Sequence, residues 1–363
     1  MTRFLAAITV VFFHFGYTLY PFNVYPWDNL FLLGPISVCY FFTLSGFIMV
    51  VVYYRPDSAG FSASGYWAAR IARIYPVYIV SLLIATPFLL GRGSAGNDQF
   101  GLVLNVLLLQ AWVAPYPLSF NFPSWSLSVE AFFYLVFPWL LPAASRLSTA
   151  TLVVSCAGIW AFSQSAIHLA LNCCYPGFPS TIHYVLYYNP VLHLNTFLLG
   201  VCSGVIFVRH LGRYSMSRTA VRVLLALLVM VLVMILLVRH RLEDYLGFRV
   251  VLENGLLAPL FAGIIVVLSL ETGLLARMLS SRPAQLLGDA SYSIYILQFP
   301  LHWVYAWGVE RHFELPQSAH FVIFVLLLVA VSIAVLLLFE RPARRRLRDV
   351  RWRWLEPEMT PRT

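Results

Sequence analysis

Long stretches of apolar residues, each about the length of a membrane crossing, dominate the pattern of this chain. A helix of about 17–25 predominantly apolar residues spans a bilayer. The eleven candidate stretches lie at 4–20, 30–52, 74–91, 101–117, 126–141, 150–167, 186–207, 221–238, 256–271, 290–308 and 320–339. The first also fits a signal peptide, but no convincing small-residue cleavage site follows it. We therefore predict an all-α, polytopic membrane protein whose first stretch is a spanning helix.

Clusters of arginine between these stretches predict the orientation of the chain. Arginine-rich loops remain on the cytoplasmic side of a membrane, and such clusters occur at 55–73, 209–218, 276–284 and after residue 340. Arg3 places the N-terminus on the same side. With both termini cytoplasmic, the number of crossings must be even, so one of the eleven stretches does not cross.

The stretch at 101–117 is the one that we expect not to cross. Pro115 and Pro117, with Pro123 just beyond, interrupt a helix there. Irregular backbone at membrane depth is tolerated only where protein shields it. The sequence thus predicts about ten transmembrane helices plus one non-spanning hydrophobic segment. They form one integral-membrane domain over 1–342, followed by a basic cytoplasmic tail over 343–363.

Composition and charge support a membrane protein, and they limit the kinds of molecule that the chain is expected to bind. Hydrophobic residues make up 60% of the 363 residues and charged residues only 11%, against about 25% charged in soluble domains. The formal net charge is +9, and the basic residues are all arginine. The arginine-rich run at 341–354 follows an apolar helix, so it predicts contact with the anionic lipid bilayer rather than with nucleic acid. The five cysteines show no metal-ligand spacing, and we expect no metal site.

An arginine and a histidine share the first apolar stretch. Arg3 and His14 are eleven residues apart, which is about three helical turns or roughly 16 Å and returns to nearly the same helix face. Arg3 then marks the cytoplasmic rim and His14 lies beyond the membrane midplane. An ionisable side chain in a span indicates function, although a histidine satisfied by a neighbouring helix gives the same pattern.

Two further features place charge in or beside apolar helices. Arg70 and Arg73 are neighbours on one helix face, and their planar guanidinium groups suit a phosphate-bearing ligand. Ordinary cytoplasmic flanking arginines would look the same. Glu130 lies inside a predicted span, where a carboxylate must pair or line a cavity. We expect it to orient His14, with Trp125 and Ser126 nearby on the same segment.

Weaker polar positions accompany these features. Ser45 precedes Gly46 in the second apolar stretch, where small residues commonly allow close helix packing. Asp289 lies at the predicted start of a helix and fits a capping role. We assign Ser45 and Asp289, like Trp125 and Ser126, to the acceptor site or to its structural support. His193 and His302 fit either packing or a site.

Taken together, these pieces resemble the membrane-bound acyltransferase 3 family. The matching order is Arg3 with His14, "FFTLSGF", Arg70 and Arg73 before Tyr-Pro, "SWSLSVEAFFY", "LGDASYSIYILQFPL" and a closing Glu-Arg-Pro, which together run from residue 3 to 342. One departure is Gln298, where many relatives have histidine. We interpret the departure to mean that position 298 is not essential to the chemistry.

The resemblance implies an O-acyltransferase that uses acyl-coenzyme A, most often acetyl-coenzyme A, as its donor substrate and holds no bound cofactor. By resemblance His14 is the catalytic histidine, and Arg3, Arg70 and Arg73 are the arginines that the family requires. The expected acceptor is a hydroxyl of an exopolysaccharide, O-antigen or lipid-linked saccharide, made at a bacterial inner membrane alongside polysaccharide-assembly proteins. Acylation of a small metabolite such as a macrolide, and transport of acyl groups or glycans without chemistry, are the alternatives.

Overall fold

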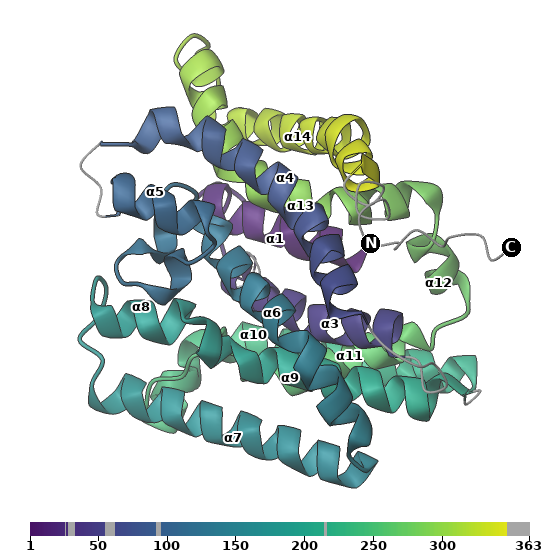
Figure 1. Ribbon diagram of the computed structural model, residues 1–363. Coiled ribbons are helices and arrows are strands. Elements are labelled where there is room, and N and C mark those ends of the chain that lie inside the picture. Colours follow the sequence, from purple (N-terminus) through teal and green to yellow (C-terminus); the bar gives the residue numbers. More distant parts are fainter. Residues whose placement is uncertain (26, 28–32, 55–61, 92–95, 214–215, 347–363) are drawn as a thin grey trace, which may run out of the picture.

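The computed structural model describes residues 1–25, 27, 33–54, 62–91, 96–213 and 216–346, which form a bundle of helices (Figure 1). Its α-helices are α1 (Thr2–Phe15), α3 (Gly34–Tyr53), α4 (Ala63–Leu89), α5 (Gln99–Val106), α6 (Trp125–Arg146), α7 (Thr149–Cys173), α8 (Thr181–Tyr188), α9 (Pro190–Arg209), α10 (Arg218–Leu246), α11 (Ala258–Ser269), α12 (Leu274–Leu279), α13 (Arg282–Tyr305) and α14 (Gln317–Val335). No strand occurs among these described residues. The predicted all-α architecture is confirmed.

Seven segments of the described chain are helical, long and apolar enough to cross a membrane. They correspond to α3, α4, α6, α7, α8 with α9, α10, and α14 with its continuation to Arg346. The protein is therefore a multi-pass membrane protein. Two more predicted spans form shorter apolar helices, α1 and α11, and α13 is not among the seven. The predicted number of ten crossings and the cytoplasmic placement of the termini remain predictions.

Several helix ends differ from the hydrophobic pattern. Helix α1 ends at Phe15 rather than near residue 20. Helix α4 begins at Ala63, ahead of the apolar stretch, and the Ser62 hydroxyl caps it by accepting from the Gly65 amide at 3.2 Å. Arg70 and Arg73 lie together on this helix, as predicted. After α14 the chain remains helical to Arg346. Residues 343–346 of the predicted tail therefore continue that helix, and 347–363 lie outside the described residues.

The segment that we expected not to cross forms no continuous helix. Helix α5 ends at Val106, and the chain then passes through three short 3₁₀ turns before α6 begins at Trp125. Buried amide side chains satisfy this irregular backbone. Gln110 donates to the Ser124 carbonyl at 3.0 Å, and Asn121 donates to the Ile296 carbonyl of α13 at 2.9 Å. These bonds join the broken segment to itself and to α13.

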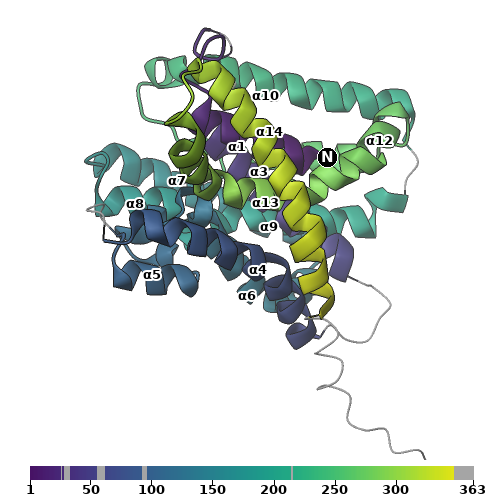
Figure 2. The ribbon, with the colours of Figure 1, turned by 90° about the horizontal axis from the view of Figure 1, so that it is seen from above.

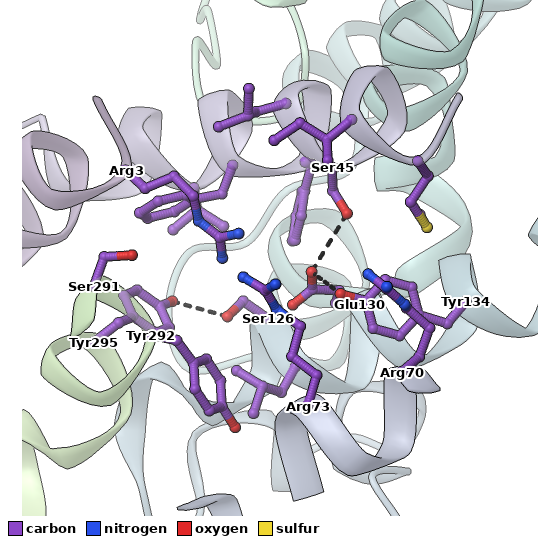
Figure 3. Close-up of a pocket in the computed structure, with 17 residues that line it drawn as sticks. Arg3, Ser45, Arg70, Arg73, Ser126, Glu130, Tyr134, Ser291, Tyr292 and Tyr295 are labelled. Carbon is purple, nitrogen blue, oxygen red and sulfur yellow. Dashed lines mark hydrogen bonds between the residues drawn. The ribbon is translucent and has the colours of Figure 1, made fainter. Parts of the chain in front are cut away.

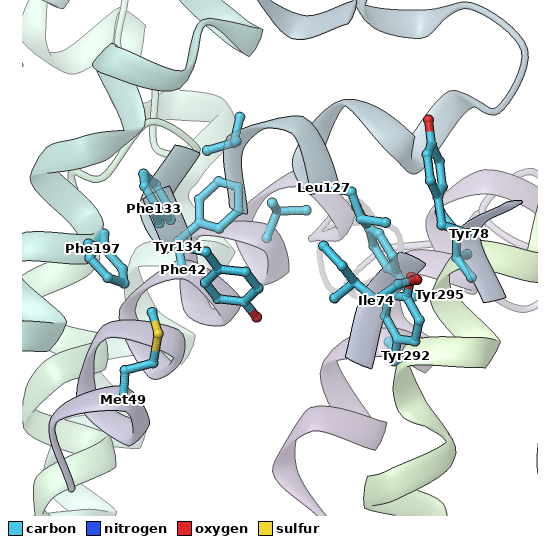
Figure 4. Packing of buried hydrophobic residues seen from close by; sticks show 14 of the residues in the cluster. Phe42, Met49, Ile74, Tyr78, Leu127, Phe133, Tyr134, Phe197, Tyr292 and Tyr295 are labelled. Carbon is cyan, nitrogen blue, oxygen red and sulfur yellow. The ribbon is translucent and has the colours of Figure 1, made fainter. Parts of the chain in front are cut away.

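Helices α1, α3, α9 and α13 form the centre of the bundle, while α7 and α10 lie at its periphery (Figures 1 and 2). Aromatic rings pack between α3, α6 and α9 (Figure 4): the Phe133 and Phe197 rings stack with centroids 4.6 Å apart, and Phe42 meets Phe133 edge-on at 5.2 Å. Along α10, by contrast, apolar residues such as Leu227 and Met230 are exposed. Such an apolar outer face is suited to lipid.

The tightest helix contact joins α3 to α9. A Cβ added at Gly46 would overlap the Phe197 carbonyl oxygen, and one at Gly200 would overlap the Thr43 carbonyl oxygen. Small residues let the two backbones approach, as they do at many membrane helix interfaces. The packing role expected for Gly46 is thus confirmed, and its neighbour Ser45 is left facing into the bundle.

Candidate functional site

Three arginines and one glutamate line a single cavity of about 720 Å³, measured to its open mouth (Figure 3). Arg3 comes from the start of α1, Arg70 and Arg73 from α4, and Glu130 from α6. We call this space the arginine cavity. Three guanidinium groups face one carboxylate, so the lining carries surplus positive charge. Arg3 and Arg70, each with a buried Nε atom that lacks a partner among the described residues, can still donate to a ligand.

A group of tyrosines fixes Arg70. Its guanidinium carbon lies 5.4 Å from the ring centre of Tyr53 and 5.8 Å from those of Tyr66 and Tyr134. Its Nη2 also donates to the Tyr53 hydroxyl at 2.9 Å. Cation–π contacts of this kind hold a guanidinium without neutralising it. Arg70 therefore keeps its positive charge available to an anion, which an ion pair with a carboxylate would cancel.

Glu130 belongs to the arginine cavity and not to His14. Its Oε1 accepts from the Tyr134 hydroxyl at 2.5 Å and from the Ser45 hydroxyl at 3.4 Å. The expectation that Glu130 orients His14 is therefore wrong. Tyr134 follows Glu130 by four residues on α6, so helical geometry alone brings these two side chains together. That spacing was the signal that could have predicted the contact.

The partner of His14 is Gln298 of α13. His14 Nδ1 lies 2.8 Å from Gln298 Oε1, while Gln298 Nε2 donates to the Tyr295 carbonyl at 2.7 Å. Because a carbonyl only accepts, the second bond fixes the amide so that its oxygen faces the histidine. His14 Nδ1 must then carry the proton, which leaves a lone pair on Nε2. The structure argues against the interpretation that position 298 is not essential to the chemistry, because a fully buried glutamine there contacts His14 and sets the histidine tautomer.

Replacing Gln298 by leucine should remove the hydrogen bond that holds the proton on His14 Nδ1. We expect kcat for a reaction that uses His14 as its base to fall by about 10- to 100-fold, because the wrong tautomer offers no lone pair at Nε2. Gln298→Glu should recover much of the loss, since a carboxylate also accepts from Nδ1. The measurement is steady-state transfer kinetics at equal amounts of folded protein. A leucine variant with wild-type kcat would contradict the role, and the KM for the donor should change little in either variant.

A second cavity, of about 700 Å³, adjoins His14, and we call it the histidine cavity. Besides His14 it is lined by Trp125 at the start of α6, Tyr188 and His193 around the α8–α9 junction, and Glu253 in the loop before α11. Burial raises the pKa of the Glu253 carboxyl above its usual value, against the opposing effect of Arg239. The apolar pattern missed Glu253 because it lies outside every apolar stretch.

The two cavities lie toward opposite ends of the central helices. Helix α1 carries Arg3 near its start and His14 near its end, and α3 returns from Pro35 in the histidine cavity to Ser45 in the arginine cavity. Arg3 and His14 do share one helix, as the sequence predicted. They do not share one cavity.

Val38 and Tyr295 line both cavities, so these two side chains separate them. The Tyr295 hydroxyl lies 2.8 Å from the Ser126 hydroxyl and donates to the Pro123 carbonyl at 3.2 Å. The structure thus places Ser126 in the lining of the arginine cavity and Trp125 in the lining of the histidine cavity. Their assignment to the acceptor site or to its support stays a prediction.

The remaining sequence candidates lie outside the two cavities. Asp289 forms an ion pair with Arg341 at 2.9 Å on the surface. It does not cap a helix, because α13 begins at Arg282. His302 lies 3.7 Å from Glu310 and lines a third, open space that His14 also borders. No cluster of His, Cys, Asp or Glu suited to a metal ion occurs in the part of the chain that the structure describes.

The sequence motifs run from residue 3 to 342, and comparison with known proteins gives a match over nearly the same range. A family profile described as acyltransferase domain matches residues 1–339. The chain belongs to the acyltransferase 3 family. The matched range includes every described residue that lines the two cavities, so the site lies within the family's own domain. No solved structure matches the chain at a significant level.

Three curated proteins are similar in sequence to this acyltransferase 3 protein. Acyltransferase MdmB of Streptomyces mycarofaciens is 33% identical over 48% of this chain and 47% of its own length. Nodulation protein 10 of Rhizobium leguminosarum bv. viciae is 31% identical over 45% of this chain and 50% of its own length. A putative acetyltransferase, ORF330 of Acidianus two-tailed virus, is 26% identical over 81% of this chain and 79% of its own length. The chain spans about half the length of the first two.

Proposed function

We propose that this protein is a membrane O-acyltransferase that moves an acyl group, foremost acetyl, from acyl-coenzyme A to a hydroxyl of a saccharide. The observation that carries the proposal is the pairing of an arginine-lined cavity with a histidine whose Nε2 lone pair is fixed, joined through one helix. Coenzyme A bears several phosphates, which guanidinium groups bind well. A histidine with a free lone pair is the commonest general base.

Each cavity has its own part in this scheme. Arg3, Arg70 and Arg73 hold the phosphates of the donor, and the thioester arm passes Val38 and Tyr295 toward His14. His14 Nε2 takes the proton of the acceptor hydroxyl while that oxygen attacks the thioester carbonyl. The C–S bond then breaks, the proton passes to the leaving thiolate of coenzyme A, and the ester product leaves. Every bond made or broken involves donor, acceptor and His14 alone.

The proposed location is a bacterial inner membrane, with coenzyme A entering from the cytoplasm. The positive surplus of the arginine cavity supports this orientation, because Arg3, Arg70 and Arg73 then lie toward the side where arginine accumulates. His14 and its cavity then open toward the outer face. An acceptor built for the cell surface, such as a lipid-linked saccharide or a chain handled by polysaccharide-assembly proteins, reaches that side.

Transfer of radioactive acetyl from acetyl-coenzyme A tests the proposal directly. The full chain, purified and reconstituted in lipid nanodiscs, is incubated with the donor and with either the saccharide fraction or the small-metabolite fraction of the source cells. We expect alkali-labile label in the saccharide fraction. Label confined to small metabolites would make the saccharide assignment wrong. Label in neither fraction would overturn the acyltransferase proposal, and uptake of label into sealed vesicles without ester formation would indicate a transporter.

The same assay tests the donor site through Arg70. Arg70→Gln should raise the KM for acetyl-coenzyme A by roughly ten- to hundredfold, the cost of losing charge-assisted bonds to a phosphate. The matched control is Arg218→Gln, which removes an exposed arginine from the start of α10. An unchanged donor KM in Arg70→Gln would exclude the arginine cavity as the coenzyme A site.

A further inference from the structure

We propose that the histidine cavity is the acceptor-binding site and that it selects a saccharide ring by presenting hydrogen-bond acceptors to its hydroxyl groups. This inference rests on the proposed function and names the place and the chemistry of its second substrate. Three side chains carry it: His193 of α9, and Glu253 and Asn254 of the loop before α11.

His193 presents a buried lone pair that none of the described residues uses. The side chain is 2% exposed, and its Nε2 lies 3.0 Å from the Tyr187 carbonyl oxygen. Because that carbonyl only accepts, Nε2 must donate to it, and the neutral imidazole then has its lone pair on Nδ1. His193 Nδ1 is buried and has no partner among the described residues. A buried acceptor without a partner costs free energy unless a ligand supplies a donor.

Asn254 repeats this arrangement from a different element. It is 1% exposed, and its amide nitrogen donates to the Leu186 carbonyl, which leaves the amide oxygen as the atom without a partner in the described chain. Its backbone carbonyl accepts from Gln164 of α7 at 3.0 Å, so the residue is held firmly in place. The two side chains that carry these buried acceptors, from separate elements, line one cavity, and Glu253 lines it as well.

The walls of the histidine cavity suit a saccharide ring and disfavour the phosphate-bearing part of coenzyme A. Trp125 packs edge-on against Tyr188 with ring centres 5.0 Å apart and lies 5.3 Å from His193. Aromatic walls with a few placed polar groups are typical of small-ligand sites. No arginine occurs among the described residues that line this cavity. Its acceptors would repel the phosphates of coenzyme A but would accept hydroxyl hydrogens.

His14 connects this binding site to the chemistry. It lines the same cavity, so a saccharide hydroxyl held there lies on the side of His14 that is away from the arginine cavity. The bound ring and the thioester then approach the histidine from opposite sides of the partition formed by Val38 and Tyr295. Binding the acceptor through hydrogen-bond acceptors also leaves the reacting hydroxyl free to give its own proton to His14 Nε2.

Separate KM values for the two substrates test this inference. We would use the reconstituted full chain, acetyl-coenzyme A, and the saccharide fraction of the source cells as the acceptor probe. His193→Phe keeps a ring but removes Nδ1, and Glu253→Gln keeps the side-chain volume but removes the charge. We expect each to raise the acceptor KM at least tenfold while the donor KM stays within twofold. The control Asp244→Asn neutralises an exposed acid of α10 and should change neither.

The possible results separate the inference from the proposed function. If the wild type transfers no acetyl, the proposed function fails and the inference fails with it. If the wild type transfers normally and both variants keep the wild-type acceptor KM, the inference alone is overturned. A rise in the donor KM instead would show that the cavity holds the acyl-coenzyme A arm. Should His193→Phe not fold, Glu253→Gln alone decides, because its change is confined to a loop.

Discussion

Replacing His14 by alanine should lower kcat for acyl transfer by roughly a thousandfold or more, the usual loss when a general base or nucleophile is removed. The physical reason is the fixed tautomer: Gln298 holds the proton on Nδ1, so Nε2 is the one nitrogen of His14 with a lone pair to offer. The measurement is transfer of radioactive acetyl in nanodiscs at saturating donor and acceptor. Donor affinity should stay near the wild-type value, because the arginine cavity does not include His14.

The matched control is His210→Ala, which removes an exposed histidine where α9 ends. It should transfer acetyl at the wild-type rate, and both variants should appear in membranes in equal amounts. A His14→Ala variant with more than a tenth of the wild-type kcat would show that His14 is a packing residue. The mechanism proposed above would then be wrong, although the acyltransferase assignment could still stand on the transfer assay.

Replacing Gly200 by alanine should strongly destabilise the fold. The added methyl group would overlap the Thr43 carbonyl oxygen of α3, and backbone cannot move aside as the end of a flexible side chain can. Overpacking commonly costs about 1–3 kcal/mol and sometimes more, and a backbone clash in the closest helix pair lies at the upper end. We expect a large fall in Tm for the purified protein in detergent, with loss of folded yield.

The control for this change is Gly158→Ala on α7, where an added Cβ would meet nothing within 4 Å. Alanine is also a better helix former than glycine, so this variant should keep or slightly raise Tm. If Gly200→Ala matched it, the close α3–α9 packing would be disproved. Because α3 carries Ser45 and Val38 while α9 carries His193, separating these helices should disturb both cavities at once.

The agreement between sequence and structure is best where a single helix carries the signal. Arg3 and His14 lie on one helix, and Arg70 and Arg73 lie on another, facing one cavity. Periodicity determines such relations, because residues on one helix keep a fixed spacing and face. The proline-broken segment at 101–117 is a similar case, since a missing backbone donor disrupts a helix wherever it packs.

The sequence-based predictions were wrong where they concerned contacts between side chains of two separate helices. Glu130 and His14 are both ionisable and both lie in predicted spans, and charge alone predicted a pair. Packing instead gave Glu130 the hydroxyls of Ser45 and Tyr134, and gave His14 an amide from α13. The role of Gln298 could not be predicted, because it depends on two hydrogen bonds. One is to a carbonyl three residues earlier, and the other is to a histidine 284 positions away. No local pattern contains that relation.

The sequence by itself determined that this is an all-helical, multi-pass membrane protein of the acyltransferase 3 family. Apolar stretches of spanning length and an ordered set of motifs are properties of the chain alone. Only the tertiary structure decided that the site is divided into an arginine cavity and a histidine cavity, with Val38 and Tyr295 between them. It also brought Glu253 in from a loop. Such contacts depend on which helix faces pack together, and that choice is made by the shapes of many side chains at once.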